Sequence, residues 1–148
     1  MSWIVNYNTD GGCADPVGLT PEEEYRRTLD FEIWFYEGVL DSCADYVEVL
    51  QALGNAYTAR GYYEKGLFVD RKLSKLCPHD PIVFYNLGCS YSLMGEVDDA
   101  IENLKTSIEL GYTDVEHMNG DPDLKNLRAD ARYEELVQRI LALRDDRA

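Results

Sequence analysis

The sequence contains two histidines, and one of them lies two residues from a cysteine that it could activate. At that spacing the His79 imidazole could accept the proton of the Cys77 thiol, which would produce a nucleophile for hydrolysis or thiol chemistry. Pro78 stiffens the link between them, and the segment joins two predicted helical units, where a loop is expected. We therefore predict that the protein is not an enzyme and has no catalytic residues. A small hydrolase or thiol enzyme remains the alternative.

The second histidine, His117, precedes Asp121 and Asp123, and the three side chains are of types that bind metal ions. The two aspartates lie in a turn beside helical sequence, however, where a carboxylate commonly caps a helix. The four cysteines are 30, 34 and 12 residues apart without a CxxC or CxxH pair, which is neither a zinc pattern nor a disulfide scaffold. The sequence predicts no metal and no cofactor.

An excess of acidic residues gives the chain a net charge of −14 at pH 7. This charge opposes the phosphates of nucleic acids and the headgroups of anionic membranes. The tyrosines that could stack on bases are also ordinary core residues of helical repeats; they are Tyr57, Tyr62, Tyr63 and Tyr91. The cysteine spacing suits a reducing compartment, and we find neither a signal-peptide pattern nor an apolar run of about 18 residues. We therefore expect a cytoplasmic protein with no nucleic-acid partner and no membrane partner.

A flexible leader and a helix are predicted at the start of the chain. Residues 1–19 are rich in Asn, Asp, Gly and Pro, which favour turns. Thr20 can then cap a helix that starts at Pro21, and Glu23 can return a hydrogen bond to the cap. The helix over residues 20–41 has an apolar stripe at helical spacing, formed by Tyr25, Leu29, Ile33, Tyr36 and Leu40. Three more aromatic residues broaden this stripe, namely Phe31, Trp34 and Phe35.

The centre of the chain contains a repeat with a period of 34 residues, found by placing residues 47–76 over residues 81–110. The six identities keep one register without a gap; they are Val49/Val83, Leu53/Leu87, Gly54/Gly88, Tyr57/Tyr91, Gly61/Gly95 and Leu76/Leu110. Gly54 and Gly88 lie within the apolar face of a helix, where glycine costs about 1 kcal/mol, so a paired helix is expected to approach closely there. Gly61 and Gly95 follow each stripe and can end the helix. Each copy is thus predicted to be a helical hairpin.

The repeats define one domain over residues 20–148. It comprises a half repeat at 20–41, full repeats at 46–79 and 80–113, and a degenerate repeat with a C-terminal capping helix at 114–148. In the last helix, Asp130 can be the cap. The residues expected to point inward are Tyr133, Leu136, Val137, Ile140 and Leu141.

The two copies resemble the tetratricopeptide repeat, through Leu50-x-x-Leu53-Gly54-x-x-Tyr57 and its counterpart that begins at Phe84. Asp70 is a departure, because it occupies the place of a usual aromatic residue. The chain's end is also similar to the ends of uncharacterised bacterial tetratricopeptide proteins. The resemblance implies an all-α fold, a right-handed superhelix (α-solenoid) of antiparallel helix pairs with about seven helices.

The family binds other proteins, and the resemblance implies a protein–protein interaction module such as an adaptor, an assembly factor or a cargo chaperone. First helices of successive hairpins line a concave groove for a peptide segment. By the resemblance, the groove residues here are Glu48, Gln51, Asn55, Ile82, Tyr85, Asn86, Cys89 and Glu116.

Asn55 and Asn86 match the two asparagines with which chaperone-binding members of the family hold a C-terminal carboxylate. The three cation positions of that clamp fall on Gln51, Glu116 and Gly120, so the positive charge is missing. We therefore expect a neutral or basic segment with an apolar anchor as the partner. The alternative is a self-associating structural module, a homodimer that forms through the helix at 21–41.

Overall fold

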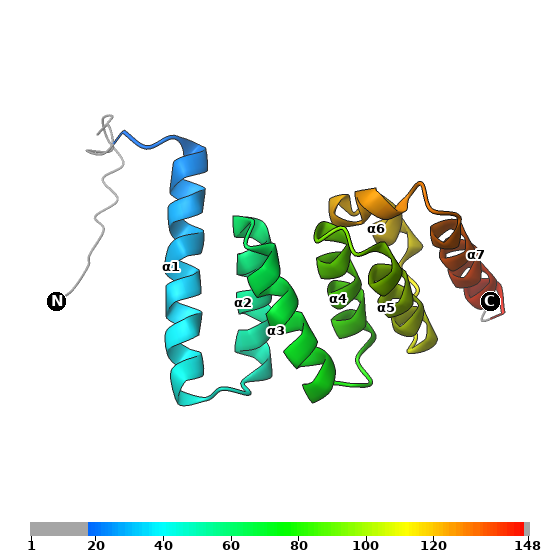
Figure 1. Cartoon of the computed structure of the whole chain (residues 1–148), viewed down its shortest axis with the longest axis horizontal. Helices are drawn as coiled ribbons and strands as arrows, with labels where there is room; N and C mark the ends of the chain where they lie inside the picture. Colours follow the sequence, from blue (N-terminus) through cyan, green and yellow to red (C-terminus); the bar gives the residue numbers. More distant parts are fainter. Residues whose placement is uncertain (1–17, 147–148) are drawn as a thin grey trace.

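Helices make up most of the described part of the chain, residues 18–146 of a computed structural model (Figure 1). They are α1 (Pro21–Ser42), α2 (Val47–Arg60), α3 (Tyr63–Leu76), α4 (Pro81–Leu93), α5 (Val97–Glu109), α6 (Val115–Gly120), the 3₁₀-helix η1 (Pro122–Leu127) and α7 (Ala131–Asp145). Consecutive helices pack in antiparallel pairs, which confirms the predicted all-α, tetratricopeptide-like architecture. About seven helices were expected, and η1 is the additional one. The leader expected over residues 1–19 lies outside the described range except for its last two residues.

Helix α1 begins at the predicted capping box. The Thr20 backbone N–H donates to Glu23 Oε2 at 2.7 Å, and the Glu23 N–H donates to Thr20 Oγ1 at 3.3 Å. Leu29 and Ile33 of the predicted stripe are buried, but Tyr25 is 57% exposed. The prediction for Tyr25 was wrong because α2 is shorter than α1. Helix α2 ends at Arg60, whose Nε lies 2.7 Å from Asp30 Oδ1, so the first turns of α1 extend beyond it.

The glycines of the repeat have the two roles predicted for them. Gly61 and Gly95 follow α2 and α4 with φ angles of 85° and 79°, so each turns the chain in the left-handed region that glycine favours. At Gly88, a Cβ atom would lie 2.9 Å from Leu104 Cγ of α5. At Gly54, it would lie 3.2 Å from Asp70 Oδ1 of α3. The close approach of the paired helices is therefore confirmed.

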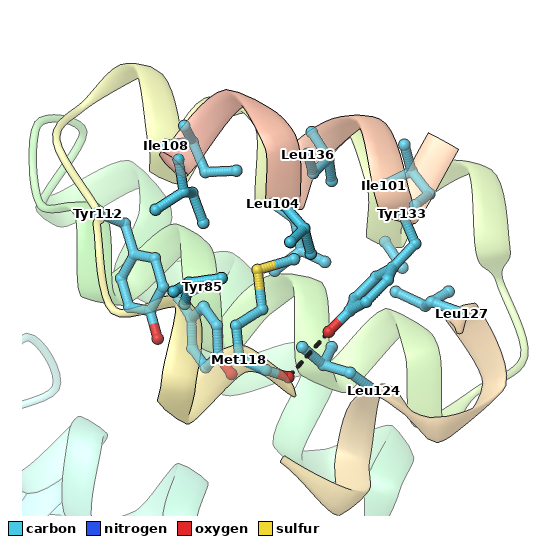
Figure 2. Packing of buried hydrophobic residues seen from close by; sticks show 14 of the residues in the cluster. Tyr85, Ile101, Leu104, Ile108, Tyr112, Met118, Leu124, Leu127, Tyr133 and Leu136 are labelled. Atoms are coloured by element: carbon cyan, nitrogen blue, oxygen red, sulfur yellow. Dashed lines mark hydrogen bonds between the residues drawn. The ribbon is translucent and has the colours of Figure 1, made fainter. Parts of the chain in front are cut away.

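The buried side chains form two clusters. The first joins α1, α2, α3 and Val83 of α4 around Leu50, Leu53 and Leu73. The second joins α4, α5, α6, η1 and α7, and Figure 2 shows Leu104 and Met118 at its centre. Helix α4 contributes to both clusters, Val83 to the first and Tyr85 and Cys89 to the second, and the cavity described below opens beside this helix.

The degenerate third unit is short because Asp121 and Pro122 end α6 and begin η1. Hydrogen bonds between α4 and η1 then hold η1 against α4. Ser92 Oγ donates to the Asp123 carbonyl at 2.7 Å, and Asn126 Nδ2 donates to the Ser92 carbonyl at 3.0 Å. Helix α7 covers the second cluster.

Asp130 caps α7 by accepting a hydrogen bond from the Arg132 N–H, as predicted. Four of the five residues expected to point inward from α7 are buried, but Leu141 is 38% exposed, so that part of the prediction was wrong. Leu141 lies in the last turns of α7, on the edge of the face that packs against the cluster, whereas Val137 and Ile140 are buried in it. Among the described helices, none is both long and apolar enough to cross a membrane.

Candidate functional site

A cavity of about 320 Å³ opens between α2, α3, α4 and the turn that joins α6 to η1. Amide, carboxylate, hydroxyl and thiol groups line it, together with small residues that keep it open, and none of the lining residues is a lysine or an arginine. The lining residues are Gly54, Asn55, Thr58, Ala59, Asp70, Asn86, Cys89, Ser90, Asp121 and Asp123.

Asp70 is the most buried charged residue at this cavity, with 6% of its surface exposed. Its Oδ2 accepts a hydrogen bond of 2.5 Å from Ser90 Oγ, which connects α3 to α4. Its Oδ1 lies against Gly54, where a side chain on α2 would fill the space. Burial raises the pKa of Asp70 to about 6, although the bond from Ser90 favours the ionised form. A cation bound in the cavity would therefore stabilise the ionised Asp70 carboxylate by pairing with its charge.

Asp121 is held by groups on both sides. Its Oδ1 accepts from the Asp123 N–H at 3.0 Å, which caps η1, and its Oδ2 accepts from the Tyr85 hydroxyl at 2.7 Å. Burial, with the nearby Asp121 charge second, raises the pKa of the Cys89 thiol. Burial also raises the pKa of Asp123, and the charge of Asp121 raises it further. Asp121 is thus occupied in holding the structure, whereas the Asp123 side chain accepts no hydrogen bond within the described residues.

The structure brings three of the predicted groove residues to this cavity: Asn55, Asn86 and Cys89. Tyr85 is buried instead of lying on the surface of the groove. Its ring stacks on Tyr112 with the centroids 4.5 Å apart (Figure 2), and its hydroxyl holds Asp121. Tyr85 therefore supports the floor of the cavity and does not line it.

The other predicted groove residues lie elsewhere. Glu48 is exposed and Gln51 is half-buried on α2, and neither lines the cavity. Ile82 borders a separate hollow of about 480 Å³ beside Tyr112 and His117. Glu116 is exposed, and its Oε1 lies 2.9 Å from Arg144 Nη1 of α7. The eight residues thus do not form one continuous lining.

Sequence reasoning did not assign Asp70, Ser90 and Asp123 to the site. Asp70 does carry a signal, because a carboxylate stands where the repeat usually has an aromatic residue on a packed helix face. Asp121 and Asp123 carry a weaker signal, because they lie in a turn beside helical sequence, where an aspartate can cap a helix or bind a metal ion. Asp121 is a cap here, and His117 Nε2 lies 3.7 Å from its Oδ2. Within residues 18–146, no group of three such side chains is arranged to hold a metal ion.

The Cys77 and His79 pair can be placed as well. Cys77 is the C-cap residue of α3 and packs against the first buried cluster, while His79 is exposed. Within the described residues, no side-chain hydrogen bond joins Cys77 to His79. The loop that contains them is closed by the Asp80 N–H, which donates to the Cys77 carbonyl. At the cavity, the raised pKa of Cys89 keeps that thiol protonated at neutral pH.

Comparison with known proteins gives two partial relatives, both from Arabidopsis thaliana. The chain is 29% identical over 90 residues to a protein named as chloroplastic, and 36% identical over 89 residues to the CTR9 homolog. Each match covers 59% of this chain, but only 27% of the chloroplastic relative and 8% of the CTR9 homolog. No family profile matches the sequence.

Both relatives contain tetratricopeptide repeats, so the comparisons and the helical structure agree on the type of repeat. Such repeats are in general protein–protein interaction modules and typically non-catalytic scaffolds. The two relatives are plant proteins, and they therefore offer no support for the likeness to bacterial proteins.

Proposed function

We propose that the protein binds a peptide segment of another protein across the face formed by α2 and α4, with a lysine or arginine side chain of that segment in the cavity. The lining of the cavity carries the proposal. It contains two asparagine amides and the carboxylates of Asp70 and Asp123, and it contains no lysine or arginine. Carboxylates in a partly buried site favour a cation strongly. An extended peptide can meanwhile donate to and accept from Asn55 and Asn86.

The electrostatics support a basic segment over an acidic one. The chain has a net charge of −14, which attracts a basic partner and repels an acidic one. Burial disfavours the ionised form of Asp70, and an ammonium or guanidinium group in the cavity would stabilise that form. An apolar anchor beside the cation would pack on the small residues of the lining, Gly54 and Ala59.

In this proposal the biological role is that of an adaptor, an assembly factor or a cargo chaperone in the cytoplasm. Among the described residues, Cys43, Cys77 and Cys89 are free thiols, and a reducing compartment would keep thiols in this state. One relative is named as chloroplastic, but that name describes the relative and does not assign a compartment to this chain. Because the chain spans about a quarter of that relative and under a tenth of the other, their activities are not transferred to it.

Selection from a phage-displayed random peptide library on the whole chain tests this function. The enriched peptides should contain Lys or Arg next to an apolar residue. The tightest of them, made synthetically, should lose at least tenfold in affinity with the Asn55→Ala/Asn86→Ala variant and with Asp123→Asn. Asp99→Asn is the matched control, because Asp99 is an exposed carboxylate of α5 outside the cavity.

Three results would contradict the proposal. The first is enrichment of acidic or purely apolar peptides, and the second is no enrichment at all. The third is equal binding of a basic peptide by the parent chain and by the asparagine double variant, which would place the binding surface elsewhere.

A further inference from the structure

The outward face of α1 carries three exposed aromatic residues. Phe31, Trp34 and Phe35 are 62%, 68% and 52% exposed, although side chains of this type are normally covered in a folded protein. Leu29 and Ile33 on the other side of the same helix are buried against α2. Helix α1 stands at one end of the row of helices, so its outward face meets no other helix of the described chain (Figure 1).

The exposed aromatic residues share this face with a glycine and an arginine. At 3.6 residues per turn, Arg27, Phe31, Trp34, Phe35 and Gly38 fall within a sector of about 100°, opposite the stripe that packs on α2. The rings of Phe31 and Trp34 are in contact, with their centroids 5.7 Å apart. The face therefore has a bulky half, at Phe31 and Trp34, and a small residue one to two turns later.

The small residue marks a hollow. Around Gly38 there is an apolar depression of about 520 Å³, lined by Trp34, Phe35, Gly38, Val39, Ser42, Cys43 and Tyr46. A Cβ atom placed on Gly38 would meet nothing within 4 Å, so the space above it is open. The face thus offers both a projecting aromatic side chain and a recess that would receive one.

We propose that a second copy of this chain covers the face, with the two α1 helices antiparallel and the dyad axis between Trp34 and Phe35. In this register, Phe31 of each copy enters the hollow at Gly38 of the other, because residues 31 and 38 are equidistant from the axis. Trp34 meets Trp34 of the second copy on one side of the axis, and Phe35 meets Phe35 on the other. One patch thereby supplies both halves of an isologous interface.

The charges at the ends of the face fit the same register. Arg27 and Asp41 are both exposed, they lie on the same edge of the face, and within the described residues neither makes an ion pair. They are nearly equidistant from the axis, since Arg27 falls opposite Ser42 and is adjacent to Asp41 of the second copy. The dimer would therefore contain two Arg27–Asp41 pairs. A parallel arrangement would instead bring like charges together.

The area agrees with a weak, reversible dimer. An aromatic side chain buries about 150–250 Å², so the exposed fractions of Phe31, Trp34 and Phe35 amount to roughly 350 Å² per copy. Two copies give roughly 700 Å² from the aromatic residues alone. The contributions of Arg27, Gly38 and Asp41 would raise the total past the approximately 1,000 Å² that a specific interface needs.

Sedimentation velocity on the full chain tests this proposal, from low micromolar to high micromolar protein concentration. The mass should rise from that of the monomer, 16.9 kDa, towards twice that value. Trp34→Ala should keep the chain monomeric throughout. Arg27→Asp and Asp41→Arg should each weaken dimerisation by about tenfold or more, because each places like charges at both ends of the interface.

The register is tested by mixing. An equimolar mixture of Arg27→Asp and Asp41→Arg chains should dimerise as tightly as the parent, since every contact between the two positions then joins an acid to a base. The variant with both substitutions in one chain should do the same. Arg26→Asp is the matched control, because Arg26 lies on another face of α1 and pairs with Glu22. Circular dichroism would confirm that every variant is folded. A chain that stays monomeric at all concentrations overturns the proposal, and so does a dimer that is indifferent to Trp34→Ala or is not restored by mixing.

Discussion

Gly88→Ala is the substitution that most directly tests the packing of one repeat. Gly88 lies on α4 where it crosses α5. A Cβ atom there would be 2.9 Å from Leu104 Cγ, 3.0 Å from Leu104 Cδ2 and 3.3 Å from the Ala100 carbonyl oxygen. Leu104 is itself almost fully buried, and the carbonyl oxygen belongs to the backbone of α5. Neither group can move away without disturbing the second buried cluster.

The magnitude follows from two opposing terms. Alanine gains about 1 kcal/mol over glycine in the middle of a helix. Overpacking a filled core costs about 1–3 kcal/mol, and the upper half of this range applies because the nearest atoms are a buried side chain and a backbone oxygen. The net expectation for Gly88→Ala is a loss of about 1–2 kcal/mol in the free energy of unfolding.

Gly38→Ala is the matched control. It is the same substitution within a helix, but a Cβ atom on Gly38 would meet nothing within 4 Å. It should therefore gain about 1 kcal/mol. Urea unfolding followed by circular dichroism, at low protein concentration so that the chain is monomeric, should rank Gly88→Ala below the parent and Gly38→Ala above it. If Gly88→Ala is as stable as the parent or more stable, the close approach of α4 to α5 does not limit this position, and the reasoning is refuted.

Three other substitutions address buried polar groups. Burial raises the pKa of Asp70 from 3.8 to about 6, so the free energy of unfolding is highest below pH 4 and falls by about 3 kcal/mol as the pH rises through 6. In urea titrations from pH 4 to pH 7, Asp70→Asn should remove this part of the decline. An unchanged decline would contradict the assignment. The Tyr133 hydroxyl donates to the Met118 carbonyl at 2.9 Å (Figure 2), whereas the buried Tyr112 hydroxyl has no partner among the described residues. Tyr133→Phe should therefore cost about 1 kcal/mol or more in thermal unfolding, while Tyr112→Phe should cost nothing, and equal losses would disprove the distinction.

Local features of the fold could be predicted from the sequence. The capping box at Thr20 and Glu23, the left-handed turns at Gly61 and Gly95, and the close contact at Gly88 all depend on residues whose conformational or steric preferences act over a few positions. The 34-residue period then fixed the pairing of helices, because each hairpin can bury its apolar face only against its neighbours.

The candidate site could be predicted only in part. Helical periodicity states which residues share a face, but it does not state which element covers that face. Tyr85 shares a face with Asn86 and Cys89 in the sequence, yet Tyr112 and Asp121 enclose it in the structure. Asp121 comes from a turn 36 residues later, which the 3₁₀-helix η1 places over α4.

The sequence by itself determined the helices, their caps and the repeat, since these follow from short-range propensities and from one periodicity. Tertiary structure alone decided which polar groups meet at the cavity and which aromatic residues of α1 stay exposed. Asp70, Asn86 and Asp123 come from three different segments and meet only after the helices have packed. Burial is a property of that packing, so the raised pKa of Asp70 and the open face at Trp34 exist only in the folded chain.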